Sequence, residues 1–353
     1  MKKNWDYEEL ASRQKLLKYY RQHPFYKQDV EVLKAMKQIE KSFSFIQLFY
    51  NSQKLFFQEK EISTLYPKYL AKFWPLIKKA ADIALKNSQL SPLSTSSNLS
   101  NNFLDALKES AAFAHSLPYP YNQKFLYWNQ NGQYLYSKMP NENIAGITFT
   151  LHYPSYQAYF VIYSTQHLTE TIIHEQSHAI FTEKEKTTAF PFFLLNETEG
   201  FFFNKQTRTY FKKDSSPDPD YLVFLEALES LVFTHLAYQS LQKYKYINHI
   251  YITETYYQLG YTYPLRLNKN LENNILRDLR LFFSYLSFLD LDKRAHQDVE
   301  KALVYLNHLR TDISHPFLEH LQTNQITFFK DEFITLERKK VETNRQTKEN
   351  LVQ

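Results

Sequence analysis

The sequence predicts a predominantly helical α+β protein with one small sheet near the middle of the chain. Only 4 of the 353 residues are glycine, which leaves few positions for tight turns and favours helices. Apolar residues recur at three- and four-residue intervals over most of the chain, which is the period of a helix. Residues 124–165 instead hold short runs of β-branched and aromatic residues bounded by turn residues, as strands do. The 28 Tyr and 29 Phe predict a core built largely from aromatic rings.

Residues 1–86 are predicted to form a helical N-terminal region, because their apolar residues follow the helical period. Prolines divide this region into segments, since proline cannot donate the hydrogen bond that a helix interior needs; they are Pro24, Pro67 and Pro75. The next stretch, residues 87–103, is rich in Ser and Asn and has little to bury. It is predicted to be a polar loop or linker and marks a domain boundary.

The sheet is predicted to lie directly before a helix over residues 166–181. Its strands are expected at Phe125–Trp128, Tyr134–Ser137, Ile147–Leu151 and Tyr159–Tyr163. The first two flank Asn131 and Gly132, a pair typical of a tight β-hairpin turn. The last strand leads directly into the helix.

Residues 216–353 are predicted to form a helical C-terminal region. Helices are expected over 221–243, 270–289, 294–309 and 331–347. The last is highly charged and is expected to be exposed.

Composition excludes several classes of function. The formal charge is +5, but the 42 Lys and Arg are interleaved with 37 Asp and Glu, so no nucleic-acid partner is expected. There are no cysteines, which excludes disulfides and thiolate sites and leaves His, Asp and Glu as metal ligands. We expect no membrane span and no cleavable signal, since the apolar stretches are short and acidic residues interrupt the first ten residues. A cytoplasmic location is the default expectation.

One short motif carries chemistry. Residues 173–179 read IHEQSHA and contain H-E-x-x-H within the helix predicted over 166–181. Residues four apart lie on one helix face, so His174 and His178 can bind one zinc ion. Glu175 is offset by one residue and can instead reach a water on that metal, so its expected role is general base.

A catalytic zinc site needs a third protein ligand, and Glu197 is the candidate. It follows His178 after 18 intervening residues and lies in the apolar segment FLLNETEGFFF, residues 193–203. A carboxylate in so hydrophobic a segment needs a partner, because burying an unpaired charge is costly. Zinc would be such a partner.

The pattern H-E-x-x-H-x18-E, with Leu195 and Asn196 before Glu197, resembles the gluzincin metallopeptidases, especially their aminopeptidases. The resemblance covers residues 147–203 and implies that His174, His178 and Glu197 hold the zinc. It departs from the family because Glu199, not Glu197, stands before Gly200, which leaves Glu199 as a rival ligand. There is also no Gly-x-Met-x-Asn segment upstream, so exopeptidase activity does not carry over.

Gluzincins of this kind also use a tyrosine to stabilise the oxyanion. Tyr257 is the candidate at a suitable distance downstream, although a structural role is the ordinary expectation in a chain with 28 tyrosines.

These observations predict a zinc-dependent metallopeptidase whose catalytic core, residues 104–215, holds the small sheet, the motif helix and the Glu197 segment. Its partner would be a peptide or protein substrate; the oligomeric state stays open. Two alternatives remain: a zinc hydrolase of a non-peptide amide or ester, and a helical binding or scaffold protein with a relic site.

Overall fold

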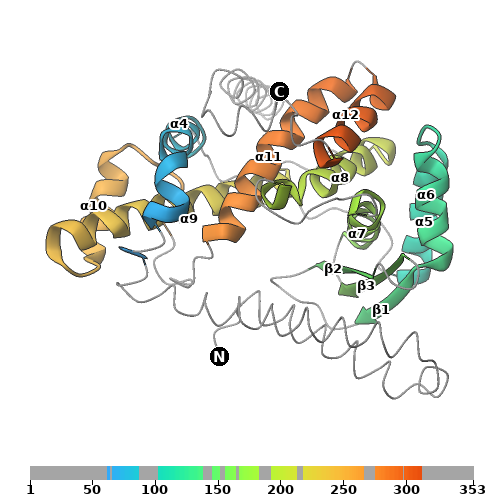
Figure 1. Ribbon diagram of the computed structural model, residues 1–353, viewed down its shortest axis with the longest axis horizontal. Coiled ribbons are helices and arrows are strands. Elements are labelled where there is room, and N and C mark those ends of the chain that lie inside the picture. The colour runs from blue at the N-terminus through green and yellow to red at the C-terminus, as the bar shows by residue number, and fades with distance from the viewer. Residues whose placement is uncertain are drawn as a thin grey trace, which may run out of the picture.

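The computed structural model describes residues 62–63, 66–86, 102–137, 145–151, 156–163, 167–182, 192–212, 218–265, 275–296 and 298–311. This part of the chain is predominantly helical with one three-stranded sheet, which confirms the predicted fold class (Figure 1). Most buried apolar side chains, from Ile62 to Leu309, form one contiguous cluster. The described parts of the predicted N-terminal, catalytic and C-terminal regions therefore share a core.

The N-terminal part of the described chain consists of η2 (Tyr66–Leu70), η3 (Ala71–Phe73) and α4 (Trp74–Ala84). Pro75 lies in the first turn of α4, where its missing N–H has no partner to lose, so this proline starts a helix. The helix α4 packs against α9 (Pro219–Tyr244). Residues 87–101 of the predicted linker lie outside the described residues. So does the helix predicted over 331–347.

Two helices precede the sheet: α5 (Phe103–His115) and α6 (Tyr121–Asn131). The first begins at Asn102, whose side chain accepts a hydrogen bond from the Leu104 N–H and so caps the helix. The second corrects the sequence prediction, because the strand expected at Phe125–Trp128 is helical and no hairpin forms at Asn131-Gly132. Gly132 instead ends α6, with its N–H bonded to the Trp128 carbonyl at 2.8 Å.

The sheet has the order β1-β3-β2, with strands β1 (Gln133–Ser137), β2 (Gly146–Leu151) and β3 (Gln157–Tyr163). The three remaining strand predictions are therefore confirmed. The central strand β3 pairs in parallel with β1 and antiparallel with β2. Alternate side chains of β3 point to opposite faces. Phe160 and Ile162 join the main core, whereas Val161 and Tyr163 pack with Ile147 on the other face.

The helix α7 (Leu168–Thr182) lies against the sheet and is surrounded by other helices (Figure 1). It packs on β2 and β3, on α5 and α6, and most extensively on α8 (Thr198–Tyr210). The short helix η4 (Phe192–Leu195) leads into α8. Both η4 and α8 pack against α11 (Ile275–Ala295), which in turn packs on α9 and α12 (Val299–Thr311). The motif helix α7 is thus enclosed by the sheet and by α5, α6 and α8.

By length and composition alone, the long helix α9 passes the test for a membrane-spanning segment. In the most apolar 18-residue window of this helix, 78% is buried inside the protein. Core helices of water-soluble proteins pass the same test. The burial of α9 against α4, α10 (His249–Gln258) and α11 accounts for its composition.

Candidate metal centre

The two motif histidines lie one turn apart on α7, as the sequence predicted. Their ring centroids are 4.8 Å apart with the planes nearly perpendicular. The helix that holds them is well packed on both sides: Ile172, Ile173 and Ala179 are fully buried. Burial of these neighbours fixes the direction in which both imidazoles project from α7.

The carboxylate of Glu197 meets both imidazoles. Its Oε2 atom lies 3.3 Å from His174 Nε2 and 3.5 Å from His178 Nε2. One ligand atom from each of the three residues lies within 4.8 Å of the other two, and no second group of three or more such side chains is found in the described parts of the chain. His174, His178 and Glu197 therefore form a group that could hold a metal ion.

Glu197 is held by α11 as well as by the histidines. Its second carboxylate oxygen, Oε1, lies 3.5 Å from Arg280 Nη2. Its backbone N–H donates to Ser284 Oγ at 3.0 Å. Burial alone would raise the pKa of this carboxyl, but the Arg280 guanidinium and the two imidazoles outweigh burial and hold the pKa well below its ordinary value. This favours the anionic form of Glu197, the form in which a carboxyl group binds a metal.

Glu199, the rival ligand, takes a different place. Its side chain is fully buried, and its Oε1 lies 3.1 Å from His178 Nδ1, the ring nitrogen opposite to the one that faces Glu197. Both carboxylates raise the pKa of His178 well above its ordinary value, although burial acts in the opposite direction. A carboxylate on Nδ1 fixes the tautomer and orientation of the ring, which leaves Nε2 available to a metal.

Glu175 lies beside the group and is 5% exposed. The Thr148 hydroxyl on β2 donates to Glu175 Oε2 at 2.6 Å. Burial raises the pKa of Glu175 above its ordinary value, and the neighbouring imidazoles reduce that rise. A carboxyl with a raised pKa is a stronger base at neutral pH than an exposed one.

Two glycines make this packing possible. A Cβ atom on Gly200 in α8 would lie 2.2 Å from His174 Cε1, and one on Gly146 in β2 would lie 2.7 Å from Glu175 Cγ. Helix α8 and strand β2 can therefore approach α7 closely only because these two positions carry no side chain.

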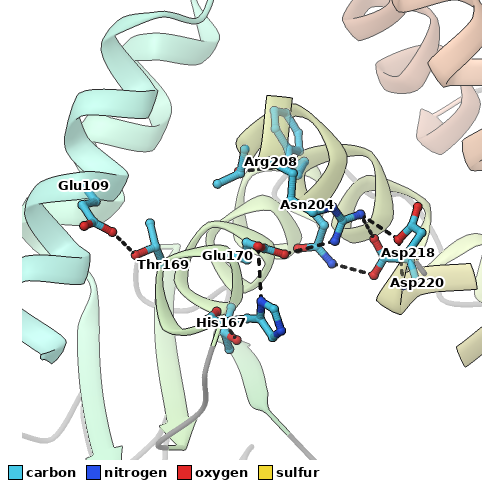
Figure 2. A network of polar contacts seen from close by, with 11 residues as sticks. Glu109, His167, Thr169, Glu170, Asn204, Arg208, Asp218 and Asp220 are labelled. Atoms are coloured by element: carbon cyan, nitrogen blue, oxygen red, sulfur yellow. Dashed lines mark hydrogen bonds and ion pairs between the residues drawn. The ribbon is translucent and has the colours of Figure 1, made fainter. Parts of the chain in front are cut away.

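A second polar cluster joins α7 to α8 and α9 around Arg208 (Figure 2). Its guanidinium contacts Glu170 at 3.1 Å, Asp218 at 3.0 Å and Asp220 at 2.6 Å, and all but Asp218 are less than a tenth exposed. Glu170, four residues before His174, is thus bound to Arg208 and His167 and not to a ligand imidazole. The cluster fixes α8, whose N-cap residue is Glu197, against α7.

The structure does not bring Tyr257 to this centre. Tyr257 lies on α10 and is 52% exposed. The helix α10 packs on α9 at the far end of the molecule from α7 (Figure 1). The sequence reasoning also missed Thr148, Arg280 and Ser284, which contact Glu175 or Glu197, because no local motif marks them.

The chain matches no family model and no curated protein. Two solved structures resemble this chain over part of their own length. One is described as a "putative oligoendopeptidase F" from Bacillus anthracis str. Ames, with 14% identity over 96% of this chain and a TM-score of 0.39. The other is described as a "putative peptidase" from Chlamydophila abortus, with 13% identity over 94% of this chain and a TM-score of 0.43. The chain spans 64% and 62% of those two proteins, less than two thirds of each.

Proposed function

We propose that the protein is a zinc-dependent peptidase of the gluzincin kind, with His174, His178 and Glu197 as metal ligands and Glu175 as general base. The observation that carries the proposal is the convergence of two imidazole Nε2 atoms on one oxygen of Glu197. The motif alone requires only the two histidines on one helix face. A three-ligand site also needs a donor from another element, and the approach of Glu197 to both rings supports the proposal that Glu197 is that donor.

The donor set fits zinc in type, and the spacing from Glu197 to each histidine fits as well. Two atoms bound to tetrahedral zinc at about 2.0–2.2 Å lie about 3.3–3.5 Å from each other. The two distances from Glu197 Oε2 to the histidine nitrogens are 3.3 and 3.5 Å. Two imidazoles and one carboxylate, with no thiolate in the chain, are also the ligand types of catalytic zinc sites in hydrolases.

When bound, zinc would acidify a water molecule toward neutral pKa and polarise the carbonyl of the substrate. Glu175 then accepts the proton from the attacking water and returns it to the leaving amine. Thr148 holds one oxygen of Glu175, so the other oxygen is left to exchange that proton. Glu199 keeps the proton of His178 on Nδ1 during these steps, because its carboxylate accepts from that nitrogen.

The first test is the zinc content of the wild type, His178→Ala and Glu197→Ala, measured by plasma mass spectrometry after purification without chelator or nickel. We expect one zinc per chain in the wild type and a loss or weakening in both variants. His167→Ala serves as the control, because His167 lies next to α7 but outside the group. A wild type without zinc, even after reconstitution, would overturn the proposal.

The second test assigns the reaction. Glu175→Gln should keep its zinc and lose hydrolysis, since the amide cannot accept the proton. Casein and a panel of small amides and esters separate a peptidase from another zinc hydrolase. A wild type that binds zinc but hydrolyses none of these compounds would favour a scaffold protein with a relic site. In that case Glu175→Gln should cause no loss of function.

A further inference from the structure

Two polar residues of α11, Arg280 and Ser284, contact the segment that carries Glu197. Arg280 and Ser284 are four residues apart and therefore lie on the same side of this helix. Ser284 is fully buried. Its hydroxyl accepts from the Glu197 N–H at 3.0 Å and donates to the Leu194 carbonyl, also at 3.0 Å.

These two hydrogen bonds use the hydroxyl as a bridge across the turn between η4 and α8. A buried backbone N–H needs an acceptor, and a buried carbonyl needs a donor. One hydroxyl meets both needs here, and it comes from a helix 87 residues further along the chain. The turn that directs the Glu197 side chain is therefore fastened to α11.

Arg280 acts on the other end of the same residue. It lies near Oε1 of Glu197, while Oε2 faces the two histidines. The last torsion of a glutamate side chain is broad, so a carboxylate without such a contact can rotate. The helix α11 thus holds Glu197 at its backbone and at one of its two oxygens.

We propose that Ser284 is a positioning residue for the metal centre: its hydroxyl bridge between Leu194 and Glu197, with Arg280 at Oε1, directs a single oxygen of Glu197 at the metal. The proposal rests on the function proposed above. Under this proposal the C-terminal region helps to position the third ligand, although it carries no recognisable motif.

The chain offers a matched control. Ser287 lies on the same helix and is equally buried, but its hydroxyl has no hydrogen-bond partner within the described residues. Ser284→Ala and Ser287→Ala therefore remove the same atom from the same helix. Only the first breaks the bridge to Glu197.

The experiment measures zinc affinity by chelator competition, together with the visible absorption spectrum of the cobalt(II)-loaded protein. We expect Ser284→Ala to lower zinc affinity by about 10–100-fold, the usual loss when a group that orients a ligand is removed. We also expect it to change the cobalt spectrum, because the ligand geometry changes. Ser287→Ala should change neither. In a Glu197→Ala background the further change Ser284→Ala should have no added effect on affinity.

Equal zinc affinities and cobalt spectra for Ser284→Ala and Ser287→Ala would overturn this proposal while leaving the zinc site in place. A wild type that binds no zinc would instead overturn the function on which it rests. If Ser284→Ala does not fold by circular dichroism, Arg280→Gln replaces it, since it removes the other contact from α11 to Glu197. Its zinc affinity should then fall below that of Ser287→Ala, and an unchanged affinity would overturn the proposal.

Discussion

Gly200→Ala is the substitution that tests most directly whether α7 and α8 are packed to hold a metal. The added Cβ would lie 2.2 Å from His174 Cε1 and 2.5 Å from its Nε2. Carbon atoms in contact are about 3.5 Å apart, so the imidazole must move by about 1.3 Å. Metal–ligand distances tolerate only about 0.2 Å. The displaced ring can therefore no longer act as a ligand.

The expected loss of zinc affinity is more than about 100-fold, because groups that merely support a ligand already account for about 10–100-fold. Stability should change less. Overpacking costs about 1–3 kcal/mol. Alanine in place of a helical glycine returns about 0.5–1 kcal/mol, so the metal-free variant should lose at most about 2.5 kcal/mol.

Chelator competition measures the zinc affinity, and urea unfolding in the presence of a chelator measures the metal-free stability. Thr198→Ala is the control, because Thr198 lies in the same turn, is equally buried and does not touch the metal group in the contacts described. Zinc affinity in Gly200→Ala within a factor of three of the wild type would refute the reasoning, since the ring would then have room that the structure does not show.

Three further predictions follow from other contacts. Gly146→Ala should keep its zinc but lower the hydrolysis rate by about 10²–10⁴-fold, because the added Cβ displaces the general base Glu175; a joint loss of metal would contradict this. Arg208→Met should lower the free energy of unfolding by about 3–5 kcal/mol in urea at neutral pH, since it leaves three carboxylates without their cation. An unchanged free energy of unfolding would refute the explanation. Burial lowers the pKa of His235 from 6.5 to about 4, so its contribution to stability is complete above pH 6.5 and is lost as the pH falls through about 4. The free energy of unfolding should therefore differ less between pH 7 and pH 4.5 in His235→Gln than in the wild type. Equal differences in the two proteins would exclude His235 as a cause of the pH dependence.

Much of the fold follows from patterns local in sequence. The strands β1, β2 and β3 and the helices α7, α9, α11 and α12 lie where periodicity and residue type predict them. The helices α5 and α10 were not predicted, and part of α6 was predicted to be a strand. The aromatic residues of α6 and the Asn131-Gly132 pair are typical of a hairpin, but Tyr121, Phe125 and Trp128 are spaced at four and three and all face the core. The helical spacing decided the structure, and Gly132 ended the helix instead of turning a hairpin.

The centre itself could be predicted only in part. His174, Glu175 and His178 belong to one helix, so their relative placement follows from helix geometry. Ser284 and Arg280 could not be found in this way, because they reach Glu197 through tertiary packing alone. The position of Tyr257 could not be predicted for the same reason. A distance along the chain says little about distance in space once two helices intervene.

The choice between Glu197 and Glu199 shows what a sequence spacing leaves open. The two residues are separated by one position, so their side chains leave the start of α8 in different directions. Glu197 lies at the cap of the helix and meets both Nε2 atoms, whereas Glu199 lies within the first turn and meets Nδ1 of His178. The positive end of the α8 dipole, near Glu197, favours its anionic form. One carboxylate can then bind the metal while the other holds the imidazole that binds it, so exchanging their roles would require α8 to rotate against α7. The close packing of α8 on α7 at Gly200, where a Cβ atom would lie 2.2 Å from His174 Cε1, opposes that rotation.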